Sequence, residues 1–170
     1  VYDLTFGSRE WRLLDAGRIT RREQRADARA GPEPWAGGFE VEGVLDDWMS
    51  MPPVPAAGCR RWWSSSSSAA TVSTTSSNIP EDVLDLLMHR DFEGLFDGGV
   101  ASCEVKINKP DPRIYQALLD KYHLRADECI FIDDRADNLV AASALGFGTY
   151  EMHGVGTLLR SLPTFGVSLH

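Results

Sequence analysis

The segment CIFIDDRADN (residues 129–138) decides the fold. Its first four residues form an uninterrupted apolar run that stops at Asp133, which is typical of a strand buried on both faces of a parallel sheet. Ligands of open parallel sheets collect beyond the carboxyl ends of the strands, so Asp133 and Asp134 are expected at the functional edge. Asp137 follows about one helical turn later. The sequence therefore predicts a group of carboxylates at this edge.

Carboxylates this close together repel one another, so the group needs a cation or a basic side chain among them. Oxygen ligands suit Mg²⁺, which takes one or two carboxylates together with waters and phosphate oxygens. We therefore expect Asp133, Asp134 and Asp137 to provide a magnesium site. The alternative for Asp134 and Asp137 is that they only cap the following helix, where acidic side chains favour the positive end of the dipole.

A second group of polar residues lies in KPDPRIY (residues 109–115). A residue before proline is held extended, so Lys109 can reach sideways to the sheet edge, balance Asp133 and bind a phosphoryl oxygen. The alternative for Lys109 is a solvated loop lysine. Asp111 is expected to cap a helix that Pro112 opens.

The rest of the second half alternates short apolar strands with helices. Strands are expected at residues 98–105 and 148–152, and helices at about 80–90 and 138–145. Ser77 and Asn78 precede the first of these helices, where they can donate to a phosphate or act only as an N-cap. The pattern predicts an α/β fold, a Rossmann-like parallel sheet with helices on both faces.

The first half differs in composition. Residues 1–57 are rich in Arg, Trp and acidic residues at helical spacing and predict a small helical subdomain, with Ser8 and the Thr20–Glu23 capping box as helix starts and a further helix at about 39–49. Residues 58–77 are Ser/Thr-rich and predict a linker or inserted loop, with a weak strand at 71–75. Residues 78–170 are expected to form the core.

Composition excludes several classes of protein. The chain has 170 residues and a formal net charge of -8, which disfavours nucleic acids and anionic membranes as partners. Three cysteines show no metal-binding spacing, and no apolar stretch is long enough to span a membrane. We expect a reduced, cytoplasmic protein. Because the sequence begins with Val1 and not Met, we expect a fragment.

In this order, Ser77-Asn78, Lys109 in KPDPRIY and FIDDRADN (residues 131–138) resemble the motifs of the haloacid dehalogenase-like (HAD) hydrolases, especially sugar-phosphatase-like members with a small helical cap. A response-regulator receiver uses similar groups, but its acidic pair comes first in the chain. The resemblance implies a Rossmann-like core, Mg²⁺ and phosphoryl transfer to an aspartate. It also implies that Ser77 and Asn78 orient the phosphoryl group, that Lys109 neutralises its charge, and that Asp133 holds the metal.

Two features depart from the family pattern. The nucleophilic aspartate has only Asp3 as a candidate, and just two residues precede it, too few for a strand. The chain also has extra residues before Ser77, an inserted loop or a stretch read in a shifted frame. We therefore expect the first core strand to be missing and a phosphatase for small phosphorylated metabolites that is incomplete or weakly active. The alternative is a non-catalytic phosphate-binding or protein-interaction domain with the same fold. A third possibility is that the chain does not fold on its own. The sequence predicts neither the substrate nor the oligomeric state.

Overall fold

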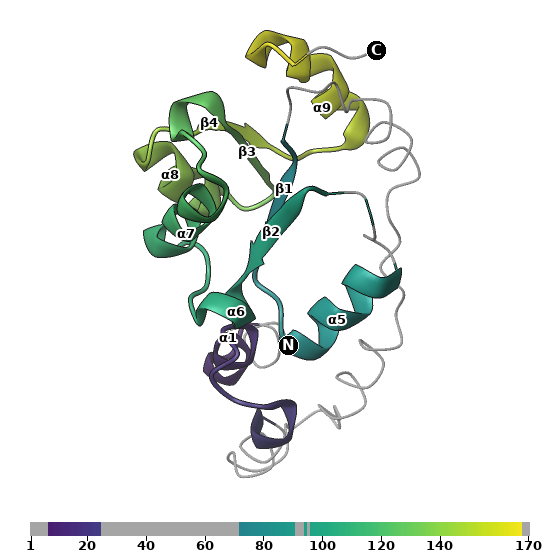
Figure 1. Cartoon of the computed structure of the whole chain (residues 1–170), viewed down its shortest axis with the longest axis vertical. Coiled ribbons are helices and arrows are strands. Elements are labelled where there is room, and N and C mark those ends of the chain that lie inside the picture. The colour runs from purple at the N-terminus through teal and green to yellow at the C-terminus, as the bar shows by residue number, and fades with distance from the viewer. Residues whose placement is uncertain (1–6, 25–71, 91–93, 95, 168–170) are drawn as a thin grey trace, which may run out of the picture.

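The computed structural model describes residues 7–24, 72–90, 94 and 96–167 (Figure 1). Asp3, the helix expected at residues 39–49 and most of the Ser/Thr-rich stretch lie outside these ranges. Every motif that the sequence singled out in residues 77–138 lies inside them.

Four short parallel strands form the centre of the described chain. They pair as β1 (Thr74–Ser77) with β2 (Gly98–Ala101) and β3 (Ile130–Asp133) with β4 (Gly148–Glu151). Both pairs are parallel, which confirms the predicted α/β class with a parallel arrangement. Ser77 lies opposite Ala101 and Asp133 opposite Glu151, so both acidic and hydroxyl motifs are at the carboxyl ends of their strands.

Strand β1 is made entirely of Thr and Ser and comprises the last four residues of the stretch expected to be a linker. The weak strand expected at residues 71–75 overlaps its first two residues. Pairing with β2 is close because Gly99 has no side chain: a Cβ at that position would collide with the side chain of Thr75. Pairing with β2 therefore makes this polar segment a strand, although it lacks the alternation of apolar and polar residues typical of strands.

Helices follow the strands, as expected. Figure 1 shows α7 and α8 on one side of the strands and α5 on the other. The bounds of the helices in the second half are α5 (Glu81–Arg90), α6 (Ser102–Val105), α7 (Pro112–Tyr122), α8 (Ala136–Ala144) and α9 (Val155–Ser161), with 3-10 turns at Ala126–Glu128 and Leu162–Phe165. Asp111 caps α7 by accepting a hydrogen bond from the Arg113 amide, with Pro112 in the first turn, as predicted.

The strand expected at residues 98–105 is shorter than predicted. It ends at Ala101, and residues 102–105 form the helix α6. The carboxylate of Glu104 accepts a hydrogen bond from the Ala101 amide at 2.9 Å, which turns the chain into the helix at that point. This short helix leads into the loop that carries Lys109.

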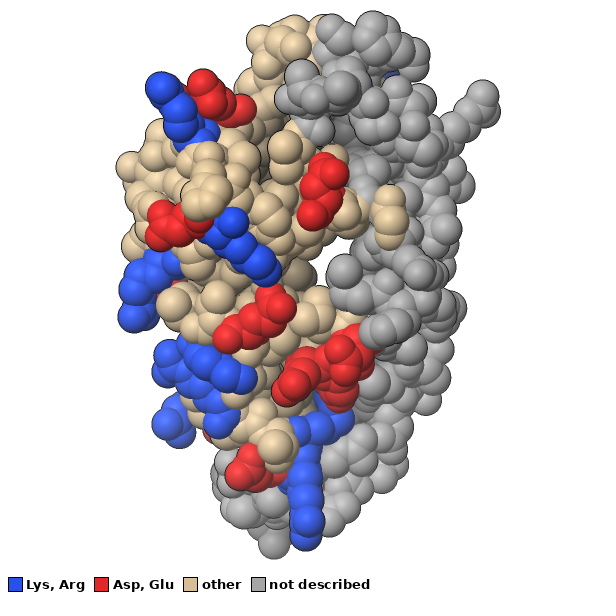
Figure 2. Space-filling view, viewed as in Figure 1, with Lys and Arg blue, Asp and Glu red and all other residues tan. Residues whose placement is uncertain are grey.

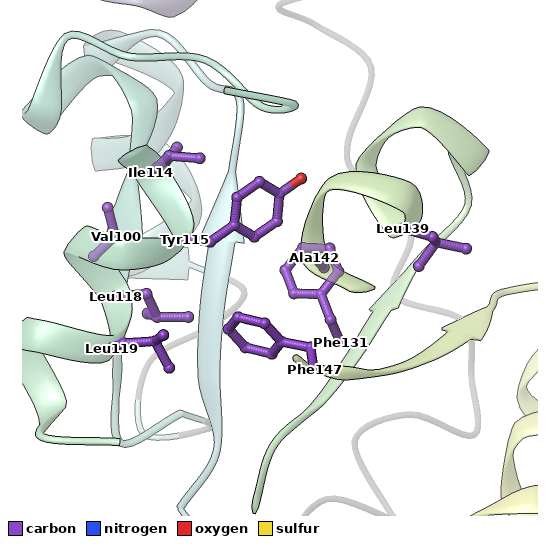
Figure 3. Close-up of a cluster of buried hydrophobic side chains, with 9 residues drawn as sticks. All are labelled: Val100, Ile114, Tyr115, Leu118, Leu119, Phe131, Leu139, Ala142 and Phe147. Carbon is purple, nitrogen blue, oxygen red and sulfur yellow. The ribbon is translucent and has the colours of Figure 1, made fainter. Parts of the chain in front are cut away.

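The main core lies between α7, α8 and the strands (Figure 3). Three aromatic rings, those of Tyr115, Phe131 and Phe147, meet edge to face with centroids 5.1 to 6.3 Å apart. Tyr115 and Ile114 are fully buried. This packing fixes α7 against β3 and places the residues that follow β3 beside α7.

The N-terminal part of the described chain packs on α6. Helix α1 (Arg9–Asp15) begins at Ser8, whose hydroxyl accepts a hydrogen bond from the Trp11 amide at 3.0 Å. Thr20 and Glu23 form the predicted capping box, with the Thr20 amide donating to the Glu23 carboxylate at 2.7 Å. Residues 21–24 are helical.

The described helices include none that is both long and apolar enough to cross a membrane. Figure 2 shows acidic and basic side chains mixed over the viewed face. Some arginines of the described chain pair with an aspartate two residues away, such as Arg125 with Asp127 and Arg113 with Asp111.

Candidate active site

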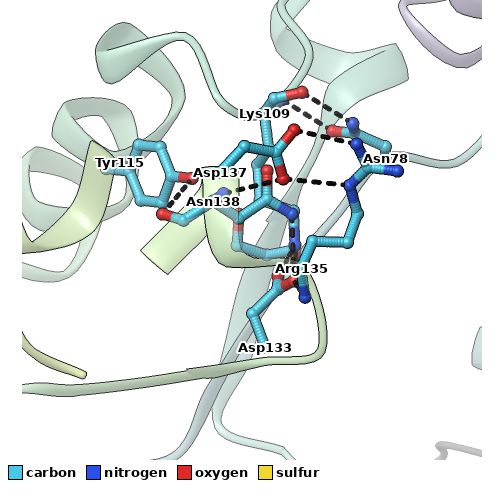
Figure 4. Close-up of polar contacts among 8 residues, drawn as sticks. Asn78, Lys109, Tyr115, Asp133, Arg135, Asp137 and Asn138 are labelled. Atoms are coloured by element: carbon cyan, nitrogen blue, oxygen red, sulfur yellow. Dashed lines mark hydrogen bonds and ion pairs between the residues drawn. The ribbon is translucent and has the colours of Figure 1, made fainter. Parts of the chain in front are cut away.

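Lys109 and Asp133 form a buried ion pair at the carboxyl ends of β1 and β3 (Figure 4). The Lys109 ammonium lies 2.7 Å from Oδ2 of Asp133, and the two side chains are only 9% and 6% exposed. The structure thus brings together the two residues that the sequence expected to balance each other. An ammonium in such surroundings has little water to weaken its field.

The Lys109 ammonium also bridges the two strand pairs. It donates a second hydrogen bond, at 2.8 Å, to the backbone carbonyl of Ser76 in β1. It lies 5.3 Å from the centre of the Phe131 ring of β3, within cation-π range. A lysine ammonium has three N–H groups, and two of them are used within the described chain. One donor of a fixed cation therefore remains for a ligand.

Asp133 is held as a carboxylate by several donors. Its Oδ1 accepts hydrogen bonds from the Arg135 amide and from Nδ2 of Asn138, both at 2.9 Å. Burial alone would raise the pKa of Asp133. The hydrogen bonds from Lys109, Asn138 and the Arg135 amide and the positive charge of Lys109 outweigh it, so the pKa lies below its ordinary value. Asp133 is therefore an ionised partner for Lys109 over the physiological pH range.

Asn78 holds the backbone of Lys109. Its Nδ2 donates to the Lys109 carbonyl at 3.0 Å, and its Oδ1 accepts from the Lys109 amide at 2.7 Å. The sequence assigned Asn78 to phosphate binding, whereas here both ends of the amide are used to fix Lys109. Ser77, the other residue of that motif, ends β1 directly before it.

Asn138 is a site residue that the sequence reasoning did not assign. It is 2% exposed, its Nδ2 donates to Asp133, and its backbone carbonyl accepts a hydrogen bond from the Tyr115 hydroxyl at 3.0 Å. Burial raises the pKa of Tyr115, and the charges of Asp133 and Asp137 raise it further, so the hydroxyl stays a neutral donor. The sequence offered one signal for this role. Asn138 is the last residue of the acidic motif, and in a helix it lies on the same face as the apolar Leu139 and Ala142.

In the part of the chain that the structure describes, neither of the other two acidic residues of the motif forms an ion pair with Lys109. Asp137 pairs with the Arg135 guanidinium through two hydrogen bonds of 3.1 and 2.8 Å, and this pairing is the main cause that lowers its pKa. Asp134 is exposed. Within the described chain, no three His, Cys, Asp or Glu side chains converge as a metal cluster would.

One buried oxygen atom near Asp133 nevertheless suits a magnesium ion. Asn138 Oδ1 is buried and has no hydrogen-bond partner among the described residues, so a carbonyl oxygen is left to accept a cation. Asp134 offers an exposed carboxylate four residues earlier in the chain. Magnesium takes a few such oxygens and completes its ligands with waters and phosphate oxygens. Asp137 would join such a set only by leaving Arg135.

Comparison with known proteins identifies the family. A family model for haloacid dehalogenase-like hydrolases matches residues 8–146. The chain belongs to this family of hydrolases. Its predicted HAD-like, Rossmann-like fold is thereby confirmed. A HAD family enzyme of Bacteroides thetaiotaomicron, solved as a magnesium complex, superposes with a TM-score of 0.71 over 90% of this chain and 80% of that chain, at 22% identity.

Curated relatives match over shorter stretches. Acyl-CoA dehydrogenase family member 10 of Mus musculus is 41% identical over 76 residues, which are 44% of this chain and 7% of that protein. The sesquiterpene phosphatase astK of Aspergillus oryzae is 38% identical over 71 residues, 41% of this chain and 36% of that protein. The chain thus matches well under two thirds of the length of these relatives.

Proposed function

We propose that this HAD-like hydrolase is a magnesium-dependent phosphatase domain acting on small phosphomonoesters. The observation that carries the proposal is the Lys109 ammonium, which is buried, fixed by Asp133 and Ser76, and has one donor left. The similarity to a sesquiterpene phosphatase supports the same chemistry.

Lys109 would bind an oxygen of the phosphoryl group. Phosphoryl transfer depends mainly on positioning and on charge stabilisation, and a desolvated ammonium supplies both. Asp133 keeps the ammonium in place, and Asn78 sets the backbone from which it extends. The Ser77 hydroxyl, at the end of β1, would contact a second phosphoryl oxygen.

Asp134 and Asn138 would hold the magnesium ion, with Asp133 beside them. The solved magnesium complex of the Bacteroides thetaiotaomicron enzyme supports the choice of magnesium as the ion. When bound, the ion would neutralise phosphoryl oxygens that Lys109 does not reach. The donor oxygens remain those of the chain, and Asn138 Oδ1 is the buried one.

The enzyme hypothesis also needs a carboxylate that attacks the phosphorus atom. Asp133 is engaged by three donor residues and Asp137 by Arg135, so neither is free to attack phosphorus. Asp3, which lies outside the described residues, is the candidate that the sequence offers for that role. If Asp3 does not attack, the same site would bind phosphate without turnover.

The test is hydrolysis of p-nitrophenyl phosphate with Mg²⁺ by the full chain and by Lys109→Met. We expect the variant to lose about a hundredfold or more in kcat/KM, because it removes a charge-stabilising donor. Lys121→Met is the matched control: its ammonium also donates to a backbone carbonyl, that of Gly99, but it is exposed and away from the site.

Equal rates for Lys109→Met and Lys121→Met would contradict the assigned site. Asp3→Asn then distinguishes the two forms of the proposal. Loss of turnover with phosphate binding retained assigns the attack to Asp3. Phosphate binding without turnover in the unmodified chain supports the non-catalytic alternative.

A further inference from the structure

Ser102 is a buried hydroxyl that joins three separate segments. Its side chain is fully buried and donates a hydrogen bond to the backbone carbonyl of Asp15, at the end of α1. The same oxygen accepts a hydrogen bond, at 2.9 Å, from the amide of Ile79, the residue after Asn78. One hydroxyl thus ties α1, α6 and the turn after β1 together.

The loop from α6 to Lys109 is fixed at both ends. The Ser102 carbonyl accepts hydrogen bonds from the amides of Lys106 and Ile107, the latter at 3.3 Å. At the other end, Nδ2 of Asn108 donates to the Arg12 carbonyl of α1 at 2.6 Å. Lys109 follows directly, with its backbone held by Asn78.

These contacts form a continuous path from α1 to the ion pair. Ser102 sets the position of Ile79 and hence of Asn78, and Asn78 sets the backbone of Lys109. The Lys109 ammonium can meet both Ser76 and Asp133 only from a defined backbone position, since both of its contacts are below 3 Å. No contact of Ser102 itself reaches Lys109, so its effect is indirect.

We infer that Ser102 is a positioning residue for Lys109: its hydroxyl docks the turn carrying Asn78 and the α6 loop onto α1, and so keeps the ammonium on Asp133. The functional part of this inference rests on the proposed phosphatase activity. Its structural part does not, because the Lys109–Asp133 contact can be observed without turnover.

The first test compares Ser102→Ala with the unmodified chain by NMR-detected hydrogen exchange of the Lys109 amide. Loss of the hydroxyl lets the turn shift, so we expect the Lys109 amide to exchange about tenfold faster or more. Ser161→Ala is the matched control, because the Ser161 hydroxyl donates to a backbone carbonyl within α9.

Asn108→Ala keeps the test informative if Ser102→Ala fails to fold. It removes the contact to α1 at a half-buried position and should also make the Lys109 amide exchange faster. If both variants fold and show the same Lys109 exchange as the Ser161→Ala control, the inference is overturned.

Activity provides the second readout. If the unmodified chain hydrolyses p-nitrophenyl phosphate, Ser102→Ala should lower kcat more than it raises KM at a temperature where it is fully folded, because a displaced ammonium weakens transition-state charge stabilisation. An unchanged kcat would count against the inference. If the unmodified chain has no activity, the proposed phosphatase function fails, and the hydrogen exchange alone decides the role of Ser102.

Discussion

At the scale of single residues, the site is organised around one charge pair. A buried ion pair is costly to break, since removing one partner leaves the other charge buried, at a cost of roughly 3–5 kcal/mol. Further hydrogen bonds offset the cost of burying the two charges: Lys109 donates to the Ser76 carbonyl, and Asp133 accepts from Asn138 and the Arg135 amide. The stabilisation from Asp133 is therefore present above the ordinary carboxyl pKa and lost as the pH falls through its lowered folded-state pKa.

Asn138→Ala tests whether Asn138 supports the Asp133 carboxylate, a role that the sequence did not assign to it. Removing Nδ2 takes one donor from Asp133, so the Asp133 pKa should rise and the free energy of unfolding at neutral pH should fall by roughly 1–3 kcal/mol. Urea unfolding measured between neutral and acidic pH would give both values. Val140→Ala, at a 70% exposed position of the same helix, is the control and should change stability by less than about 0.5 kcal/mol. Equal stabilities would show that Asn138 does not support Asp133.

The sequence predicted the charged residues of the site better than the amides. Asp133 follows an apolar strand and Lys109 precedes a proline, and both signals are local to the chain. The contacts of Asn78 and Asn138 could not be predicted in the same way, because an amide can donate or accept and its partner depends on which loop packs beside it. Their roles became visible only when the loop at Lys109 and the helix α8 were placed.

At the scale of elements, strand β1 could not be predicted from its own sequence, whereas helix α1 could. The Ser/Thr composition of β1 indicates a linker, since it offers little apolar area to bury. Its strand conformation comes from pairing with Gly98–Ala101, a contact distant in sequence. Helix α1, in contrast, carries its signal locally in the Ser8 cap and in the buried Trp11 and Leu14.

Helix α1 also carries a buried carboxyl group. Asp15 is 9% exposed, and burial raises its pKa from 3.8 to about 7, although a hydrogen bond from Trp11 and the charge of Arg21 act in the opposite direction. Below about pH 4 the group is protonated in both the folded and unfolded chains. Between about pH 4 and 7 only the unfolded chain ionises, so stability falls as the pH rises, and above pH 7 the loss is complete.

Asp15→Asn should remove this pH dependence. The amide oxygen can still accept from Trp11, and no charge is buried, so the variant should be more stable than the unmodified chain at pH 8 by an amount on the order of a few kcal/mol. Thermal melts at pH 5 and pH 8 measure the change. Asp120→Asn, an exposed acid in α7, is the control. A variant that loses stability equally at both pH values would show that folding does not raise the pKa of Asp15.

At the scale of the whole molecule, fold and site depend on the same contacts. The two strand pairs belong to separate sheets in the described chain, and Lys109 links them by donating to Ser76 of β1 and Asp133 of β3. Most helices and strands from residue 79 onward could be predicted from periodicity and caps; the exceptions are α6, which was expected to be part of a strand, and α9. The junction between the pairs could not, because it depends on contacts between residues more than twenty positions apart.

The central claim is that the Lys109 site binds a phosphoryl group, and calorimetric titration with inorganic phosphate in the presence of Mg²⁺ tests it most directly. This measurement needs no attacking carboxylate, so it holds for the enzyme and for the non-catalytic alternative. We predict that the unmodified chain and Lys121→Met bind phosphate with similar affinity and that Lys109→Met shows at least about a tenfold loss. Phosphate binding of equal affinity in Lys109→Met would contradict the account, as would no binding by the unmodified chain.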